Sequence, residues 1–233
     1  QPLGIGRQIA ARGNLFGWRA IFWSFLVFGT VSALWLLLRQ PETLPPEKRV
    51  PLRAGPVIHA FAEVFSNKQV MAYLSALTFS FASMFVWLST IATIFEDVYD
   101  RGASFPLWFA LSALLSAPGS LVNAQLVMRL GMRRLIFSAL LAQLSLIVTV
   151  AALFWGGAPV PFWLFFVFMV GHFFTVGLIF GNLNALALEP LGHVAGTASS
   201  VMGGVSTMVS AAIAAPIATL YNGTIAPLVA GVG

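Results

Sequence analysis

The sequence predicts an all-α membrane protein, and two observations lead to that prediction. Of the 233 residues, 59% are hydrophobic and only 8% are charged, whereas about 25% of residues are charged in soluble domains. The hydrophobic residues also gather into uncharged runs, most plainly in residues 162–220, where two runs of 27 residues are joined by five others. A helix rises about 1.5 Å per residue and needs about 20 apolar residues to cross a hydrocarbon layer of about 30 Å. These two runs therefore predict a membrane hairpin.

Residues 1–38 are predicted to end in one complete span. Residues 1–19 contain Arg7, Arg12 and Arg19 and no long apolar run, which is typical of a loop that follows an earlier span, and residues 20–38 form the first complete span. The chain begins with Gln1 and shows no pattern of a cleaved signal sequence. We therefore expect it to be part of a longer protein.

Residues 39–68 form the longest connection between predicted spans and are expected to be a linker between domains. Three prolines in its first half prevent a continuous helix. In its second half, apolar residues recur at helical spacing opposite His59 and Glu63, which predicts either a short helix on the membrane surface or a plain linker helix. The apolar positions are Val57, Ile58, Phe61, Val64 and Phe65.

Five further complete spans are predicted, which makes six in all. They cover residues 69–95, 105–128, 135–154, 162–188 and 194–220. Pro118 is expected to bend the second of these five. A last apolar run, residues 225–233, is too short to cross a membrane and is expected to be cut short. In residues 69–95, the side chains expected to touch lipid are Leu77, Phe81, Met84, Leu88 and Ile91.

The charges of the loops predict how the spans are oriented. Because each span reverses the side, the loops 39–68, 129–134 and 189–193 share one face of the membrane. That face holds eight of the twelve Lys and Arg residues, and the other face holds four. By the positive-inside rule, the linker 39–68 is therefore expected in the cytoplasm.

The composition argues against several classes of function. There is no cysteine, so disulfides, thiolate metal sites and cysteine nucleophiles are excluded. The net charge of +5 comes from basic residues between apolar runs, which does not indicate a nucleic-acid surface. None of the six complete spans contains Lys, Arg, Asp or Glu, and neither HExxH nor GxSxG occurs. We therefore expect no enzyme activity, no metal site and no cofactor.

Uncharged polar side chains at membrane depth are the candidate functional residues. Such a group needs a partner, water or a ligand in hydrocarbon. In residues 162–188, His172, Thr175 and Asn182 fall within about 80° of one another around a helix. His172 lies about 15 Å from the start of the span, near the membrane centre. It is expected either to contact a ligand or proton in a water-filled cavity or to be a neutral imidazole bonded to a neighbouring helix.

Other spans carry similar polar stripes. In residues 105–128, Ser112, Ser116 and Asn123 share a face, and residues 69–95 show one stripe through Thr78 and Phe85 and another through Ser80, Ser83, Trp87 and Thr90. In residues 194–220, small residues at spacing four on two faces favour tight helix packing. The substrate-binding candidates that could line a cavity are Ser75, Thr78, Phe85, Ser116, Asn123, His172, Thr175 and Asn182.

Several short segments resemble the Bcr/CflA-type drug:proton antiporters of the major facilitator superfamily. They are residues 18–22, 42–44 and 129–134 and, above all, Glu189-Pro190-Leu191-Gly192-His193-Val194-Ala195-Gly196-Thr197-Ala198-Ser199-Ser200. The resemblance covers nearly the whole chain but only the second half of such a protein. It implies the C-terminal six-helix half of a transporter. Residues 1–38 would then end the N-terminal half, residues 39–68 would be the cytoplasmic linker, and residues 69–233 the C-terminal bundle, truncated in its last span.

The resemblance also implies a function, namely a proton-coupled efflux transporter in the bacterial inner membrane. Such a protein exports small amphipathic drugs or metabolites by alternating access, and its partners are the small-molecule substrate, protons, the lipid bilayer and the missing N-terminal half. Met128 replaces the aspartate of the family's cytoplasmic signature, so a salt-bridge latch on that residue is not expected. The family's proton-coupling acid lies in the first half, which agrees with the uncharged spans here. The alternative is a non-transporting helical scaffold or sensor module.

Overall fold

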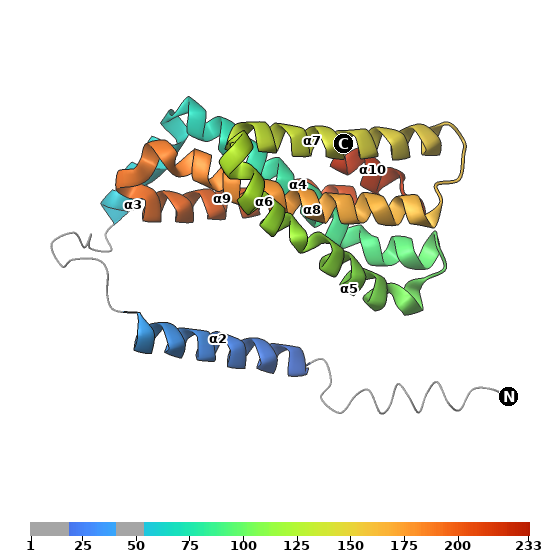
Figure 1. Ribbon diagram of the computed structural model, residues 1–233, viewed down its shortest axis with the longest axis horizontal. Coiled ribbons are helices and arrows are strands. Elements are labelled where there is room, and N and C mark those ends of the chain that lie inside the picture. The colour runs from blue at the N-terminus through green and yellow to red at the C-terminus, as the bar shows by residue number, and fades with distance from the viewer. Residues whose placement is uncertain (1–18, 41–53) are drawn as a thin grey trace. The chain divides into compact units, whose positions relative to one another are not determined.

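The computed structural model describes residues 19–40 and 54–233. The chain divides into two units, residues 1–52 and 53–233. In the first unit, α2 (Arg19–Arg39) is a single apolar helix (Figure 1). Its described side chains are mostly exposed. This helix confirms that residues 20–38 are helical. The expectations for Arg7, Arg12, residues 42–44 and the three prolines fall outside the described residues.

The second unit is a bundle of helices, which confirms the predicted all-α membrane class (Figure 1). In the described part of the chain, five helical segments are long and apolar enough to cross a membrane, and the last of them, Phe162–Thr219, contains both α8 and α9. Short 3₁₀ turns lie at Gly102–Ser104 (η2) and Glu189–Val194 (η3). The helices are α3 (Ala54–Ser66), α4 (Lys68–Asp97), α5 (Phe105–Ser116), α6 (Pro118–Leu130), α7 (Met132–Trp155), α8 (Phe162–Leu188), α9 (Ala195–Thr219) and α10 (Ala226–Val232).

Local sequence signals set several helix boundaries. The side-chain oxygen of Asn67 accepts hydrogen bonds from the backbone N–H groups of Gln69 (2.9 Å) and Val70 (3.2 Å), and it thereby caps α4. The predicted bend at Pro118 is present, because α5 ends at Ser116 and Pro118 begins α6. Gly131, between α6 and α7, has a φ of 77°, a conformation that favours glycine.

The helix α4 lies at the centre of the bundle and packs against α8, α9 and α10. In its second half, the fully buried Trp87 has its ring centroid 5.5 Å from that of Phe165 and 4.9 Å from that of Phe168, both on α8. On its other side, Ser210 of α9 donates a hydrogen bond to the carbonyl of Thr78 at 2.7 Å. The small residues of α9 thus allow the close packing that the sequence predicts.

Of the five residues of α4 predicted to face lipid, two are buried and a third, Phe81, packs against Phe180 of α8. Leu77 is 1% exposed and Ile91 is 2% exposed, whereas Leu88 is 47% exposed. Leu77 packs in a cluster with residues of α7 and α8. Ile91 lies in the buried cluster that also contains Trp87, Phe165 and Phe168. The prediction assumed that one side of α4 faces other helices and the opposite side faces lipid. Because other helices pack on several sides of α4, apolar residues opposite a polar stripe can also face a helix.

The helix α3 packs against α9 and α4 through Ala60 and Val64, which are fully buried. On its polar side, Glu63 Oε1 lies 2.9 Å from His193 Nε2 in η3, and Glu63 Oε2 lies 3.7 Å from His59 Nδ1. The helix predicted in the second half of the linker is therefore present and contacts the turn between α8 and α9.

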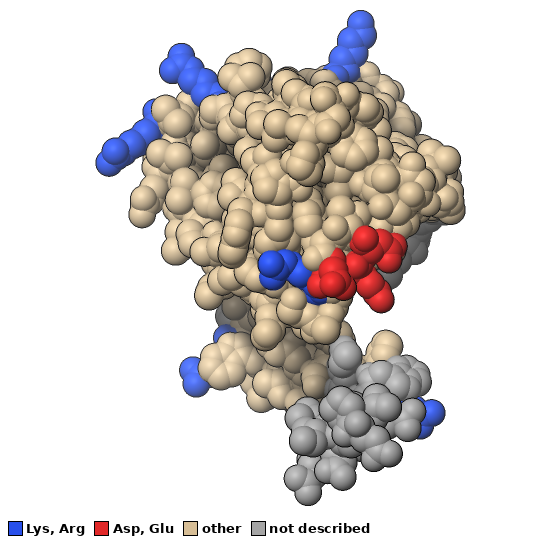
Figure 2. All heavy atoms as spheres, turned by 90° about the vertical axis from the view of Figure 1, so that its right-hand side faces the viewer, with Lys and Arg blue, Asp and Glu red and all other residues tan. Residues whose placement is uncertain are grey.

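The end of the bundle at the α4–α5 connection is acidic. Figure 2 shows acidic side chains gathered there beside a basic one, and this connection contains the exposed Glu96, Asp97 and Asp100. Arg101 follows them, with its guanidinium carbon 4.4 Å from the ring centroid of Phe162, a cation–π distance. Tyr221, just after α9, donates a hydrogen bond to Asp97 at 3.2 Å, and burial together with this carboxylate raises the pKa of Tyr221 to about 12.

Candidate functional site

A groove of about 350 Å³ lies between α4, α7 and α8. We call it the polar groove, because three buried polar side chains, Gln143, His172 and Thr175, lie in its wall. Ser80 and Ser83 of α4 also line it, and Val232 and Gly233 of the α10 segment form one end. Its remaining lining residues are Ala76, Phe79, Leu140, Leu144, Ile147, Val176 and Ile179.

His172 and Gln143, which line the polar groove, carry buried polar atoms that have no hydrogen-bond partner among the described residues. His172 is 4% exposed, and its ring stacks on Trp87 with centroids 5.6 Å apart. Its Nε2 atom is buried and has no hydrogen-bond partner among the described residues. The same holds for both polar atoms of the Gln143 side chain, which is 6% exposed. A buried polar group without a partner costs about 1–3 kcal/mol. Because these three atoms are themselves buried, an occupant of the groove could bond to them only if the two side chains turned toward it.

Two of the eight predicted site residues, His172 and Thr175, thus meet in the polar groove. Two others, Asn182 and Asn123, meet elsewhere: Asn182 Nδ2 donates to Asn123 Oδ1 at 2.6 Å and to the carbonyl of Leu178 at 2.7 Å. This bond joins α8 to α6. Ser116 similarly joins α5 to α8, since its hydroxyl donates to the carbonyl of Val170 at 3.2 Å.

The hydroxyl groups of Ser75 and Thr78 bond within α4. Each donates to the carbonyl four residues earlier, Met71 for Ser75 and Leu74 for Thr78, both at 2.8 Å. Ser75 is exposed, whereas Thr78 is 7% exposed. Both donors are therefore satisfied without a ligand.

Phe85, the last of the eight, belongs to one of two groups of partly exposed rings on α4, α5 and α8. Its ring centroid lies 6.3 Å from that of Phe81, which lies 4.4 Å from that of Phe180 on α8. Phe109 of α5 is 6.0 Å from Phe173 of α8. We call Phe81, Phe85, Phe109, Phe173 and Phe180 the aromatic stripe; all five rings are partly exposed.

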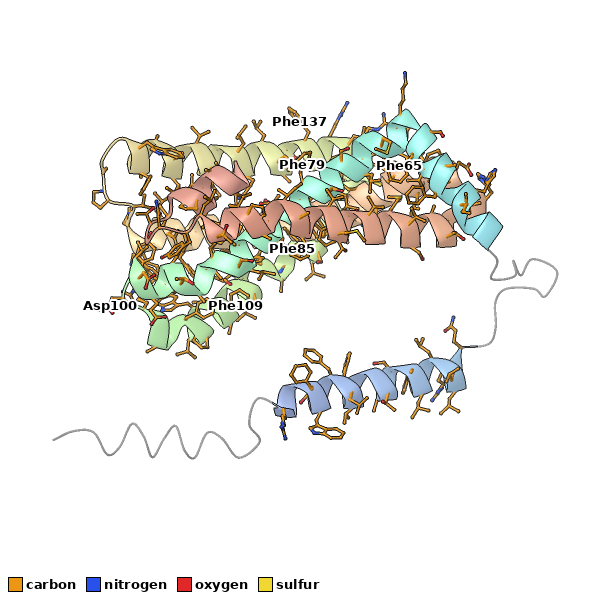
Figure 3. The ribbon with its side chains drawn as sticks, turned by 180° about the vertical axis from the view of Figure 1, so that it is seen from behind. Phe65, Phe79, Phe85, Asp100, Phe109 and Phe137 are labelled. Carbon is orange, nitrogen blue, oxygen red and sulfur yellow. The ribbon has the colours of Figure 1, made fainter. Side chains whose placement is uncertain are left out.

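The aromatic stripe and the polar groove lie on different sides of α4. Phe79, at the groove, and Phe85, in the stripe, are six residues apart, which corresponds to about 120° around a helix. Figure 3 shows Phe79 nearer to α7 than Phe85. Partly exposed aromatic rings offer an apolar and polarisable surface, which is the usual lining of sites for small molecules.

Sequence reasoning selected Phe85 but missed the rest of the stripe and missed Gln143. The other rings are common residues in apolar spans, and only the packing of α5 and α8 against α4 brings them together. Gln143 did carry a signal, because it is the one amide side chain in residues 135–154. Within residues 19–40 and 54–233, no group of three His, Asp or Glu side chains could hold a metal ion.

Comparison with known proteins gives one family and several relatives. The family model described as "Major Facilitator Superfamily" matches residues 9–215. The "Bicyclomycin resistance protein homolog" of Haemophilus influenzae is 28% identical over 228 residues, which cover 94% of this chain and 55% of that protein. The "Uncharacterized MFS-type transporter YdgK" of Bacillus subtilis is 23% identical over 212 residues, 91% of this chain and 52% of the relative.

A third relative is the "Multidrug resistance protein MdtM" of Escherichia coli O157:H7, which is 27% identical over 207 residues, 86% of this chain and 48% of the relative. The chain therefore spans about half the length of the curated relatives it matches. No solved structure is significantly similar to the chain.

Proposed function

The chain belongs to the Major Facilitator Superfamily, and from this premise we propose that it is the C-terminal half of a proton-coupled drug exporter. Two of its relatives are named for resistance, one to bicyclomycin and one to multiple drugs, and the chain matches about half of each. The whole protein would export small amphipathic compounds from a bacterial cell by alternating access, in which two helical halves rock about a central cavity.

At the level of residues, the aromatic stripe is the observation that supports this proposal most directly. It joins α4, α5 and α8 in a bundle whose predicted complete spans hold no charged side chain. Rings of this kind can stack on flat drugs and attract lipophilic cations by cation–π interaction. Without a charged partner, cargo would be chosen by shape and apolar surface, which suits a broad substrate range.

The eight predicted residues take different parts in this proposal. Phe85 would contact cargo directly, as part of the wall formed by α4, α5, α6, α8 and α9. The hydrogen bonds of Ser116 and of the Asn123–Asn182 pair would hold α5 and α6 against α8 and so fix the shape of that wall. Thr78 bonds to α9 through its carbonyl. Ser75 remains a candidate cargo contact. His172 and Thr175 line the polar groove, on a different side of α4 from the aromatic stripe, so they are not assigned to this cargo path.

Proton coupling would depend on the other half of the protein. The complete spans described above contain no Asp or Glu that could exchange a proton at membrane depth. The coupling acid would therefore lie in an N-terminal half. The excess of Lys and Arg in the loops at residues 39–68 and 129–134 supports a cytoplasmic location for the linker.

Efflux of ethidium, a flat lipophilic cation, from cells that express the full-length protein tests this function. The wild-type protein should lower ethidium accumulation, and a protonophore should abolish the effect. Phe85→Ala should slow efflux about three- to tenfold, because an aromatic contact contributes about 0.5–1.5 kcal/mol beyond its buried area.

Phe137→Ala is the matched control. Phe137 lies on α7, is 70% exposed and points away from the bundle (Figure 3), so its loss should leave efflux unchanged. A wild-type protein that moves neither ethidium nor other drugs would contradict the exporter assignment. Equal efflux by the Phe85→Ala and Phe137→Ala proteins would instead remove the aromatic stripe from the cargo path.

A further inference from the structure

The turn between α9 and α10, residues 220–225, contains a chemically labile pair of residues. Asn222 stands directly before Gly223, and it is the one asparagine of the chain that a glycine follows. Both residues are exposed and lie outside the helices. Asparagine is a thermolabile residue, because the nitrogen of the next peptide group can attack its side-chain amide carbon. A following glycine has no Cβ atom and leaves that nitrogen accessible.

Gly223 presents its nitrogen without hindrance. Its φ of 78° lies in a region that glycine adopts readily, and a Cβ atom built on it would have no atom of a more distant residue within 4 Å. Among the described residues, no backbone carbonyl accepts a hydrogen bond from its N–H group. Gly223 also lines a hollow of about 590 Å³, which provides room for water beside the turn.

Thr224 supplies a hydrogen bond that favours the attack. Its hydroxyl donates to Asn222 Oδ1 at 2.6 Å. Negative charge develops on this oxygen when a nitrogen attacks the amide carbon, and a hydrogen-bond donor that is already in place stabilises that charge. The same hydroxyl oxygen accepts a hydrogen bond from the backbone N–H of Ala226 at 3.2 Å, at the start of α10. The donor is therefore held in position.

We propose that Asn222 is a site of spontaneous covalent modification, at which its side-chain amide becomes a carboxyl group. The nitrogen of Gly223 forms a bond with Asn222 Cγ, and the bond from Cγ to the amide nitrogen breaks. Ammonia leaves and takes with it the proton of the Gly223 N–H. Water then opens the resulting cyclic imide at either of its two carbonyl groups, which leaves aspartate or isoaspartate. The inference does not depend on the exporter function.

The modification should weaken a contact between the end of α9 and α4. Tyr221, the residue before Asn222, donates a hydrogen bond to Asp97 of α4 at 3.2 Å. A new carboxylate beside Tyr221 adds negative charge at an end of the bundle that already holds the exposed Glu96, Asp97 and Asp100. Isoaspartate also lengthens the main chain by one carbon atom. Both products should therefore disturb the contact of Tyr221 with Asp97.

Peptide mapping by mass spectrometry tests the site. The purified full-length protein is incubated in mildly alkaline and in mildly acidic buffer, and the conversion of each asparagine is followed over time. Asn222 should be converted, and faster in the alkaline buffer, because a base must remove the proton of the Gly223 N–H. Asn67 is the internal control: its side-chain oxygen accepts two backbone hydrogen bonds and Lys68 follows it, so it should keep its amide.

Two results overturn the site. One is an unchanged Asn222, or equal conversion of Asn222 and Asn67. The other is a glycan on the amide nitrogen of Asn222, because residues 222–224 have the Asn-x-Thr pattern of a glycosylation acceptor and a glycan would occupy that nitrogen.

Two variants of Thr224 isolate the role of its hydroxyl. Thr224→Val should slow the conversion of Asn222 about two- to tenfold, the factor that corresponds to one lost hydrogen bond. Thr224→Ser keeps the hydroxyl and should leave the rate unchanged. Equal rates in the two variants would overturn the assistance by Thr224, as would faster conversion in the Thr224→Val protein.

The melting temperature of the same samples tests the weakened contact. It should fall by about 2 °C as Asn222 is converted. Asn222→Gln is the matched control, because glutamine would have to close a larger ring and should keep its amide, so its melting temperature should stay constant during the incubation. An equal fall in the wild-type and Asn222→Gln proteins would contradict the effect on the contact, since a change elsewhere would then cause it.

Discussion

Two asparagines on α8, Asn182 and Asn184, differ in the hydrogen-bond partners of their side chains. The amide of Asn182 donates to Asn123 on α6, whereas the amide of Asn184 donates only to the carbonyl of Phe180, four residues earlier in the same helix, at 3.0 Å. In a bilayer, a hydrogen bond between helices contributes about 0.6 kcal/mol on average and up to about 1.7 kcal/mol. Two similar residues on one helix are therefore expected to have different effects on stability.

We predict that Asn182→Ala destabilises the bundle by about 1 kcal/mol, because it breaks the tie between helices and leaves the Asn123 oxygen unpaired. Asn184→Ala should have a much smaller effect. Unfolding of the purified full-length protein by sodium dodecyl sulfate measures both. An equal loss for the two variants would mean that the Asn123–Asn182 bond does not join the helices in the membrane.

Single residues were the hardest feature to predict from the sequence. Polar side chains at membrane depth could be found by inspection, but their partners could not. His172 and Asn182 share a stripe on a helical wheel, yet one lies in the polar groove and the other bonds to α6. The difference depends on which helix lies beside each turn of α8, and hydropathy carries no information about that.

At the scale of elements, the close approach of α6 and α8 depends on one glycine. A Cβ atom on Gly119 would lie 3.0 Å from the carbonyl oxygen of Phe174, a backbone atom that cannot move without shifting the helix. A Cβ atom on Gly177, in the same interface, would have its nearest neighbour at 3.7 Å, an ordinary contact distance.

We predict that Gly119→Ala destabilises the protein by about 1–3 kcal/mol, the usual cost of overpacking a well-packed interface. Gly177→Ala should be nearly neutral. Detergent unfolding or thermal melting of the two variants measures the difference. Similar melting temperatures for both would show that α6 lies farther from α8 than described.

The attachment of α3 to the bundle should depend on its apolar side more than on its charges. Glu63 and His193 are 2.9 Å apart, but the His193 side chain is 61% exposed, and exposed pairs of this kind contribute at most about 1 kcal/mol. Val64 is fully buried against α9 residues such as Ala198 and Met202.

We therefore predict that Val64→Ala loosens α3, since the loss of two buried methyl groups costs about 1.6 kcal/mol. Amide hydrogen exchange in α3 should become about tenfold faster. Phe61→Ala is the control, because Phe61 is 47% exposed, and it should change exchange little. Equal acceleration by both substitutions would mean that α3 is not held by its buried side.

Most elements could be predicted because their causes are local. Long uncharged runs predicted the membrane helices, and Pro118 predicted a bend at the place where α5 ends and α6 begins. The predictions failed where the exposure of a residue depends on which helices lie beside its own. Leu77 and Ile91 were expected to face lipid, but α4 is surrounded by other helices, and both residues are buried.

At the scale of the whole molecule, the described bundle has two surfaces that several helices form together, the polar groove and the aromatic stripe. We propose that the aromatic stripe faces the cargo path between two halves. Neither surface could be predicted from hydropathy, because both are formed by residues of three different spans. The family could be predicted, since it rests on short segments such as Glu189–Ser200 and agrees with the match to residues 9–215.

Transport by the purified full-length protein in liposomes tests the central claim most directly. An imposed pH gradient should drive ethidium across the membrane against its concentration gradient, and dissipation of the pH gradient should stop the movement. The Phe85→Ala protein should transport more slowly than the Phe137→Ala protein under the same gradient. Ethidium that equilibrates at the same rate with and without the pH gradient would contradict the account of this chain as half of a proton-driven drug exporter.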